Sequence, residues 1–398
     1  MTTTRETPSA VETTDALLNA LDALLPEVAE RASEAERLRT MPPRLVARVE
    51  AAGLFRMLRV RAIGGLEVDP PTVVDIVERL AHADASAAWT VLIGATANAF
   101  FGWLDPDVAR EMLKECPSAS STCVLAPGGA AVPDGPDGFT VRGRWGFNSG
   151  IVHSAWRQVG VIVHDADGPR TGESGAPDIR IAFVPASEGE VRDTWEVMGL
   201  RGTGSHDLVL EGVSVPAGRM ITIASDNRHD CAYARLPLFS LVQLGVIGFP
   251  LGIARRALEE FTALAREKTR GTGVRWSVAE SSHVQAELGR AEGELMAARA
   301  FADQAVRALW DAVQTTGEAP VAVRAQVSMA TQHAMRAAVS VTDTVFHHAG
   351  GGAIFIDSPL QRCFRDVHTA AQHVFYSAEA DQRLARLRLG FDEPTTMI

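Results

Sequence analysis

The period of the apolar residues changes twice along the chain, and these two changes divide it into three parts. Up to residue 116, apolar residues recur three and four positions apart, which is the spacing of one face of a helix. Threonine or aspartate before such a stretch, and proline in its first turn, are typical of helix starts. This part is therefore predicted to be helical, with helices at Asp15–Ala35, Pro42–Gly53 and Pro71–Ala83.

The middle part has the pattern of strands joined by turns. Glycine and proline separate short runs of β-branched and aromatic residues, and we expect strands at Phe139–Trp145, Val159–Val163, Ile179–Val184 and Leu208–Val215. Helical spacing then returns in long segments, which pack as a bundle. The prediction is an α+β chain, mostly α, with a helical domain (1–116), a central β-barrel or β-sandwich domain (117–225) and a C-terminal helical bundle (226–398).

Composition and charge argue against several classes of protein. Hydrophobic residues make up 46% of the 398 residues, which is enough for a sizeable core. The net charge is −11 and the acidic excess is scattered, so a nucleic-acid binder or a polybasic membrane-surface protein is not expected. The 4 cysteines form no C-x-x-C pair, and the N-terminus has no signal pattern. A reducing cytoplasm fits these observations.

The stretch Ala85–Leu104 carries no formal charge and is long enough to span a membrane. It contains several serine, threonine, glycine and asparagine residues, and it lacks flanking lysine or arginine. Asp84 and Asp105 stand at its two ends instead. We therefore expect a helix buried in the protein rather than a membrane span.

The glycine-rich segment Gly199–Gly204 does not match a dinucleotide-binding loop. It reads G-x-x-G-x-G and leads into an expected strand, whereas a Rossmann phosphate site requires the N-terminus of a helix. A nicotinamide site is therefore not expected on this chain. A metal site is not expected either, because His347 and His348 are adjacent in sequence. His368 and His373 are five positions apart, about 140° around a helix, and so do not share a face.

Two segments near the C-terminus each have two interpretations that the residues alone leave open. In Arg365–His373, polar residues stand beside apolar ones, and chemistry alone favours hydrogen-bonded core or interface histidines over catalytic ones. Gly350–Gly352 is either a helix C-cap with a flexible turn, or a backbone surface close to a flat or anionic ligand.

Taken together, several segments resemble the acyl-CoA dehydrogenase superfamily, and within it the two-component flavin-dependent monooxygenases. These segments are Asp84–Trp89, Gly143–Gly150, Gly199–Ser205, Ser358–Arg362 and Arg365–His368. The resemblance covers nearly the whole chain. It implies a C-terminal four-helix bundle, a flavin held between this bundle and the β-domain, and a homotetramer in which a neighbouring subunit contributes to the cofactor site.

The residues after the Arg365-Asp366 pair separate the branches of the superfamily. Common acyl-CoA dehydrogenases place a glutamate there to remove the α-proton of the substrate, but Ala371–Val374 contains no carboxylate. The monooxygenase branch has a histidine at this place instead, and the resemblance assigns this catalytic position to His373. Glu379 and Asp381, further along, are expected to be solvated helix positions.

In the monooxygenases that the chain resembles, reduced flavin and O2 form a C4a-hydroperoxide. This adduct collapses to hydrogen peroxide unless water is excluded and the flavin N5–H is held. The resemblance implies that Ser149 lies near N5 and accepts this hydrogen bond. It implies that His373, with an ordinary pKa of about 6.5, acts as the base toward a phenol O–H or hydrogen-bonds the hydroperoxide itself.

The same resemblance implies further site residues. Those expected to contact the cofactor are Trp145, Arg270, Gly351 and Gly352, with Arg270 at the flavin phosphates. Those expected to line the substrate pocket are Trp89, Asn98, Phe239 and His368. Asn98 stands where some relatives carry a histidine, eight or nine residues after the tryptophan, and is expected to replace its polar contact.

The leading hypothesis is the oxygenase component of a two-component monooxygenase. It takes reduced FAD or FMN from a separate NAD(P)H–flavin reductase and uses O2 to hydroxylate an aromatic or polycyclic small molecule. One alternative is N- or S-oxygenation by the same fold, and another is an acyl-CoA dehydrogenase-like enzyme that uses a different base. A ligand-binding or assembly protein that has lost flavin is the non-enzymatic alternative.

Overall fold

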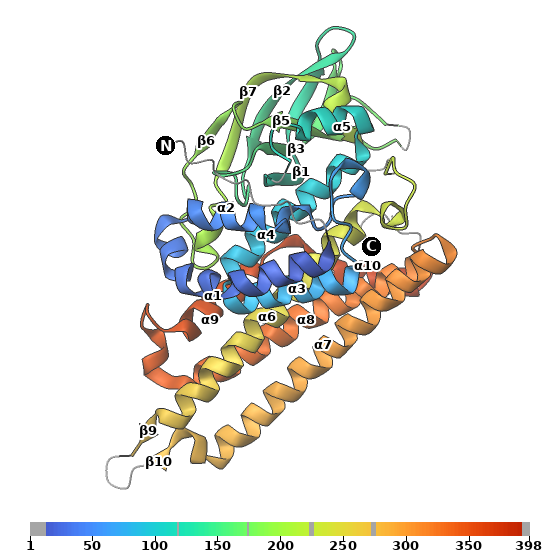
Figure 1. Cartoon of the computed structure of the whole chain (residues 1–398). Coiled ribbons are helices and arrows are strands. Elements are labelled where there is room, and N and C mark those ends of the chain that lie inside the picture. Colours follow the sequence, from blue (N-terminus) through green and yellow to red (C-terminus); the bar gives the residue numbers. More distant parts are fainter. Residues whose placement is uncertain (1–12, 118, 173–174, 223–226, 272–275, 392–398) are drawn as a thin grey trace.

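The computed structural model describes residues 13–117, 119–172, 175–222, 227–271 and 276–391. In Figure 1 the sheet lies at the top, the N-terminal helices pack beneath it, and the long C-terminal helices extend away below. The α+β class, mostly α, and the order of helices, strands and helices are confirmed. The exact boundaries at residues 116 and 225 stay a prediction.

The N-terminal helices begin where side-chain caps predict. Thr13, Asp69 and Asp84 each accept a hydrogen bond from a backbone N–H in the first turn that follows them. The helices are α1 (Thr14–Leu38), α2 (Pro43–Ala51), α3 (Pro70–Ala83), α4 (Ala85–Ala99) and α5 (Pro106–Leu113). The expected buried helix is α4, in which every residue except Ile93 is buried. Its side chains contact α3, α6 and β1.

The strands pair in the order β6-β7-β2-β1-β3-β5-β8, with β4 against β3. Their bounds are β1 (Ser121–Pro133), β2 (Gly138–Trp145), β3 (Trp156–Asp165), β4 (Gly168–Pro169), β5 (Ile179–Pro185), β6 (Glu190–Arg192), β7 (Asp207–Pro216) and β8 (Met220–Thr222). The strands expected from the sequence are β2, β3, β5 and β7. The other strands were not expected, and β1 is the most important of them because it lies between β2 and β3.

The glycines of β1 explain why the sequence did not indicate this strand. Gly128 and Gly129 suggested a turn, yet they lie in the strand and face the ring of Trp145. A Cβ atom would come within 2.7 Å of that ring at Gly128 and within 2.5 Å at Gly129. Glycine is therefore required because the ring packs directly on the backbone, which is one of the uses of glycine inside a strand.

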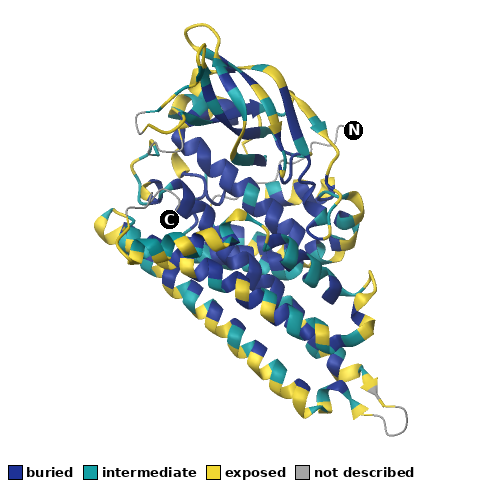
Figure 2. Ribbon diagram, turned by 180° about the vertical axis from the view of Figure 1, so that it is seen from behind, coloured by how far each residue is buried: buried dark blue, intermediate teal, exposed yellow. Residues whose placement is uncertain are grey.

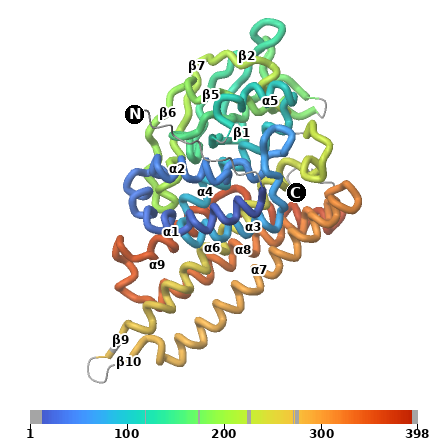
Figure 3. The backbone as a smooth tube through the Cα atoms, viewed as in Figure 1, coloured from blue at the N-terminus to red at the C-terminus, as the bar shows by residue number. Residues whose placement is uncertain are grey.

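The C-terminal part is built from α6 (Leu238–Glu267), α7 (Ser282–Thr316), α8 (Val321–Ala349), α9 (Pro359–Ala370) and α10 (Ala378–Arg388). Figure 3 shows the chain running along α6 to the pair β9 (Thr269–Arg270) and β10 (Trp276–Ser277), back along α7, and down again along α8. Short 3-10 helices, η8 (Gly350–Ile354) and η9 (Val374–Tyr376), stand before and after α9.

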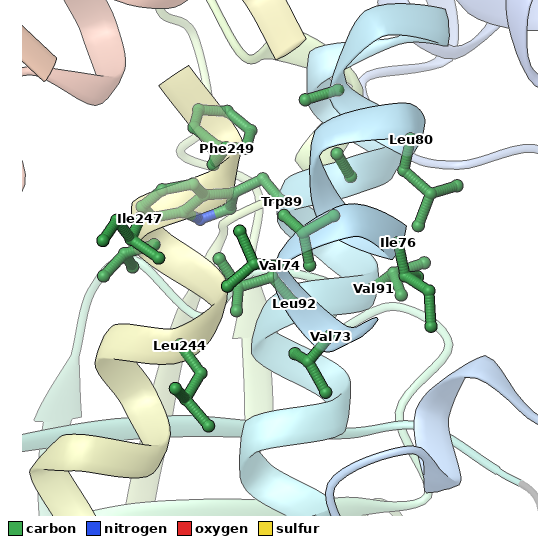
Figure 4. Close-up of a cluster of buried hydrophobic side chains, with 14 of the residues drawn as sticks. Val73, Val74, Ile76, Leu80, Trp89, Val91, Leu92, Leu244, Ile247 and Phe249 are labelled. Carbon is green, nitrogen blue, oxygen red and sulfur yellow. The ribbon is translucent and has the colours of Figure 1, made fainter. Parts of the chain in front are cut away.

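Helix α6 is long and apolar enough to cross a membrane, but 94% of its most apolar stretch is buried inside the protein. Gly245, Gly248 and Gly252 share one face and lie against Leu92, the Val74 carbonyl and the Glu78 carbonyl. These glycines let α6 approach α3 and α4 closely, as Figure 4 shows for Leu244 and Ile247 beside Val74 and Leu92. Figure 2 shows that this region is almost entirely buried, whereas much of α7 is exposed.

Candidate active site

Trp89 joins three parts of the molecule. Asp84 caps α4 one turn earlier by accepting the Ala87 N–H at 2.8 Å, which places Trp89 near the start of the helix. The indole ring meets Phe249 of α6 edge-on at 5.0 Å, visible in Figure 4, and the ring of His373 at 5.1 Å. The indole N–H donates to Ser149 Oγ at 3.1 Å. One side chain thus contacts α6, a loop of the sheet and the segment after α9.

The loop that carries Ser149 is held in an unusual backbone conformation. Phe147 has a φ of 62°, in the left-handed region that bulky residues seldom adopt, and its side chain is 76% exposed. The buried Asn148 amide holds the loop by donating to the Trp145 carbonyl at 2.6 Å. Gly150 donates its N–H to the Thr203 carbonyl at 2.8 Å. Strain such as that at Phe147 is costly and is often found at functional loops, and sequence reasoning did not single out this residue.

Ser149 lies in a row of buried hydroxyl groups. Its Oγ is 2.8 Å from Ser205 Oγ, which is 2.7 Å from Thr203 Oγ1. Thr203 and Ser205 belong to the loop Gly199–Ser205, which packs on α9 and α4. The Leu200 N–H donates to Asp366 of α9 at 2.6 Å, and the Gly202 N–H donates to Ser86 of α4. Only the folded chain brings these hydroxyls together, so sequence reasoning missed both Thr203 and Ser205.

His373 lies outside α9, which ends at Ala370, and caps η9 instead. The helical angle between His368 and His373 expected from the sequence is therefore wrong. The ring stacks on Phe375 at 5.4 Å, and Phe375 lies 6.2 Å from Phe239. The next residue, Tyr376, donates its hydroxyl to the Val246 carbonyl of α6 at 2.5 Å, which fixes η9 against the bundle.

Burial sets the protonation of His373. It lowers the pKa of the imidazole to about 4, so the ring is neutral near pH 7. The Phe375 N–H donates to Nδ1 at 3.4 Å, which assigns the ring proton to Nε2. His373 thus offers an N–H donor on a ring that lies against Trp89.

Comparisons with known proteins show the family of the chain. Residues 244–378 match the family model described as acyl-CoA dehydrogenase, C-terminal domain. An indole-3-acetate monooxygenase from Pseudomonas putida is 32% identical over 89% of this chain and 90% of the relative. The chain belongs to the flavin-dependent monooxygenases of the acyl-CoA dehydrogenase superfamily.

Other relatives of this monooxygenase point the same way. The p-hydroxyphenylacetate 3-hydroxylase oxygenase component from Acinetobacter baumannii is 26% identical, over 96% of this chain and 91% of the relative. The crystal structure of the HsaA monooxygenase from Mycobacterium tuberculosis superposes with a TM-score of 0.87 at 27% identity, covering 96% of this chain and 99% of that one. The acyl-CoA dehydrogenase-like fold is therefore shown over nearly the whole chain.

Two residues that were expected to contact ligands are buried and hydrogen-bonded within the protein. Trp145 is only 1% exposed, donates its indole N–H to the Gly160 carbonyl at 2.7 Å, and packs inside the sheet. Asn98 is fully buried, accepts from Arg59 at 3.2 Å, and donates to the Gly94 and Ala119 carbonyls. The expected contacts of Trp145 and Asn98 with ligands stay a prediction.

The remaining expected residues lie at the bundle. His368 faces α8, where its Nε2 is 2.8 Å from Asp343, so the structure gives it a protein partner rather than a place beside His373. Gly351 and Gly352 are exposed in η8, and Lys268 reaches this turn by donating to the Ala349 carbonyl at 2.5 Å. The side chain of Arg270 lies outside the described residues.

Lys268 also lines a groove of about 440 Å³ between α6 and the start of α9. Glu260, Glu267, Ser358 and Leu360 are among its other lining residues. The groove is formed by different residues from those around His373. Lys268 thus supplies a cation beside the glycine turn. The expected place of Arg270 at the flavin phosphates stays a prediction.

His153 is a further candidate that sequence reasoning missed. Its ring is buried next to Gly150 and 6.4 Å from Phe55, and neither ring nitrogen has a hydrogen-bond partner among the described residues. Burial lowers the pKa of the imidazole to about 4. A buried neutral histidine must leave one N–H unpaired unless a ligand or water meets it, which is costly.

The carboxylates beyond His373 do not replace a dehydrogenase base. Asp381 of α10 pairs with Arg336 of α8 at 2.6 Å, and Glu379 is exposed. Both positions agree with the solvated helix face that the sequence indicated. The structure thus supports the assignment of this monooxygenase to the branch that lacks a catalytic carboxylate at this place.

Proposed function

We propose that this protein binds reduced FAD or FMN beside Ser149, Trp89 and His373, and uses O2 to hydroxylate an aromatic small molecule. The observation that carries the proposal is the direct contact of Trp89 with both Ser149 Oγ and the His373 ring. A flavin fits this place because the Phe147 ring, 76% exposed on a strained loop and edge-on to Trp195, offers an aromatic surface two residues before Ser149. Bound reduced flavin supplies the chemistry of oxygen activation.

The residues of the chain would hold and shield the reacting groups. Ser149 Oγ, which already accepts the Trp89 N–H, would also accept the N5–H of the reduced flavin. His373 would donate its Nε2–H to an oxygen of the substrate or of the activated oxygen species. The rings of Trp89, Phe249 and Phe375 exclude water from this side of the site, which limits the release of hydrogen peroxide.

An aromatic substrate is the class that these rings fit. Trp89 meets the His373 ring edge-on and Phe375 stacks on it. Phe249 packs against Trp89, and Phe239 packs against Phe375. Aromatic walls bind flat apolar molecules, while a single N–H donor orients their polar group. Relatives named indole-3-acetate monooxygenase and p-hydroxyphenylacetate 3-hydroxylase act on molecules of this class, as their names state.

The reduced flavin would come from a separate NAD(P)H–flavin reductase in the cytoplasm. The glycine-rich loop Gly199–Ser205 places Thr203 and Ser205 in the row of hydroxyls and leads into strand β7 rather than a helix. The cysteines of the described residues are free thiols, which suits a reducing compartment. A homotetramer would cover Ile354, Phe355 and Ile356, which are 65–77% exposed beside the glycine turn of η8.

The test is oxygen-isotope transfer. Chemically reduced FAD or FMN, the protein and a panel of phenols and indoles are mixed with labelled O2, and the products are analysed by mass spectrometry. The proposal predicts a ring-hydroxylated product carrying one labelled atom, without NADH or a reductase. A product oxygenated at nitrogen or sulfur would change the reaction class. A tightly bound oxidised flavin that acyl-CoA thioesters reduce would overturn the proposal in favour of a dehydrogenase.

A further inference from the structure

A row of hydrogen bonds runs from Trp89 to the backbone carbonyl of Leu200. The indole N–H lies 3.1 Å from Ser149 Oγ, which lies 2.8 Å from Ser205 Oγ. Ser205 Oγ lies 2.7 Å from Thr203 Oγ1, and Thr203 Oγ1 lies 2.9 Å from the Leu200 oxygen. The three hydroxyl groups thus connect an N–H at one end to a carbonyl at the other.

The two ends of this row fix the direction of every hydroxyl in it. An indole N–H can only donate a hydrogen bond and a carbonyl can only accept one, whereas a hydroxyl donates one and accepts up to two. If Ser149 donates to Ser205, Ser205 to Thr203, and Thr203 to Leu200, all contacts of the row are hydrogen bonds. In the opposite direction the contact of Thr203 with Leu200 contains no proton, and one hydrogen bond is lost.

Burial makes this loss matter. Thr203, Ser205 and Ser149 are at most 4% exposed, so bulk water does not replace a missing hydrogen bond. The acceptor end is also held in place. Leu200 has a left-handed backbone with a φ of 53°, and Asp366 accepts its N–H. The Trp195 indole N–H donates to the same carbonyl at 3.0 Å.

We propose that Ser205 and Thr203 are positioning residues that turn the Ser149 O–H away from the flavin and leave a lone pair of Ser149 Oγ facing it. This rests on the proposed function, in which Ser149 faces flavin N5. N5 carries a hydrogen in reduced flavin and is only an acceptor in oxidised flavin. The fixed Ser149 lone pair therefore suits the reduced form. To donate to N5 of the oxidised form, Ser149 must turn its O–H away from Ser205, which costs the row one hydrogen bond whether Ser149 turns alone or all three hydroxyls reverse.

The size of the preference for reduced flavin follows from the one hydrogen bond that the row loses when the Ser149 O–H turns toward N5. A buried neutral hydrogen bond contributes roughly 0.5–1.5 kcal/mol net, which corresponds to a preference of about threefold to tenfold. The row is expected to raise the ratio of the dissociation constant of oxidised flavin to that of reduced flavin by this factor. The same factor raises the two-electron midpoint potential of the bound flavin by about 15–30 mV.

The experiment measures both dissociation constants anaerobically, with FMN and with FAD, for the wild type and for Ser205→Ala. Without Ser205 Oγ, the Ser149 O–H is free to turn toward N5 of oxidised flavin. We expect the preference for reduced flavin to fall by about threefold to tenfold, and the midpoint potential of the bound flavin to fall with it. Thr203→Val, which keeps the shape of the side chain but removes the proton path to Leu200, should lower the preference in the same way.

Two controls separate orientation from packing. Ser205→Thr keeps a hydroxyl and should restore the wild-type ratio. Ser154→Ala removes another buried serine hydroxyl of the same region, one that donates to the Ile151 carbonyl at 3.1 Å outside the row, and should leave the ratio unchanged. Equal weakening of both flavin forms by Ser205→Ala and by Thr203→Val would overturn the proposal. Failure of the wild type to bind either form would instead overturn the proposed function.

Discussion

His373 carries its ring proton on Nε2, because the Phe375 N–H donates to Nδ1. Burial also lowers the pKa of the ring to about 4, which makes the neutral imidazole a weak base toward a phenol with a pKa near 10. The sequence left two roles open for this residue, the base and the hydrogen-bond partner. At the scale of the residue, the structure favours the hydrogen-bond donor.

Substitution of His373 distinguishes a donor from a base. We predict that His373→Ala still consumes reduced flavin and O2 but releases hydrogen peroxide, with hydroxylated product falling by roughly tenfold or more. His373→Gln keeps an N–H donor without a basic nitrogen and should recover a substantial part of the product yield. The product and peroxide formed per reduced flavin are measured together. Equal loss in both variants would favour the base, and full product from His373→Ala would remove His373 from the site.

The buried His153 allows an independent prediction about the stability of the protein at acid pH. Its pKa is lowered to about 4 in the folded protein, whereas the ordinary value is 6.5, so the unfolded chain binds more protons between these values. Its contribution therefore lowers the free energy of unfolding as the pH falls from 6.5 toward 4. In urea unfolding, we expect the free energy of unfolding of His153→Leu to fall less steeply with decreasing pH over this range than that of the wild type, by up to about 1 kcal/mol per pH unit. The same dependence of the free energy of unfolding on pH in both proteins would contradict the lowered pKa of His153.

At the scale of the element, the spacing of the apolar residues predicted most of the helices and strands. The three N-terminal helices expected from the sequence, the strands β2, β3, β5 and β7, and the long helices α7 and α8 formed because each has one apolar face or a short β-branched run. Strand β1 did not follow from its residues, since the glycines that resemble a turn accommodate Trp145 from the neighbouring strand β2. Such a contact is visible only in the folded chain.

The glycines of α6 allow the packing of this element to be tested. A Cβ at Gly248 would lie 2.5 Å from the Val74 carbonyl of α3, and backbone does not move aside easily. We predict that Gly248→Ala lowers the free energy of unfolding by roughly 1–3 kcal/mol. Gly289→Ala is the matched control, because the Gly289 Cβ would meet no atom within 4 Å in α7, and it should raise stability by up to about 1 kcal/mol. Equal effects of the two changes on melting temperature would refute this packing.

At the scale of the whole molecule, the site lies where all three parts of the chain meet. Asp366 of α9 holds the Leu200 loop of the sheet beside Asp84 of α4, and Arg365 pairs with Glu36 of α1. The resemblance to a family led to Ser149, Trp89 and His373. Thr203, Ser205 and His153 could not be found from the sequence, because their roles come from neighbours that are distant along the chain.

Substitution of Asp366 tests whether this residue holds the three parts of the chain together. Its burial raises the pKa of the carboxyl to about 7, above the ordinary value of 3.8, so the folded protein binds more protons between these values. Its contribution to stability therefore decreases as the pH rises toward 7. Asp366→Asn keeps an oxygen for the Leu200 N–H, and its stability relative to the wild type should increase from pH 5 to pH 8. Asp366→Ala leaves that N–H unpaired and should be less stable than Asp366→Asn by roughly 1–3 kcal/mol at both pH values. Denaturant unfolding measures both, and a pH-independent difference for Asp366→Asn would contradict the raised pKa.

The most direct test of the whole account is rapid mixing of the protein, saturated with chemically reduced FMN or FAD, with oxygenated buffer. The visible absorbance of oxidised flavin and the consumption of O2 are followed together. We predict that, with at least one of the two flavins, oxidised flavin returns well after O2 is consumed, because Ser149, Trp89 and His373 hold and shield the reacting flavin. Ser149→Ala should shorten this delay. Return of oxidised flavin at the rate of free flavin, with both cofactors and saturating protein, would contradict the account.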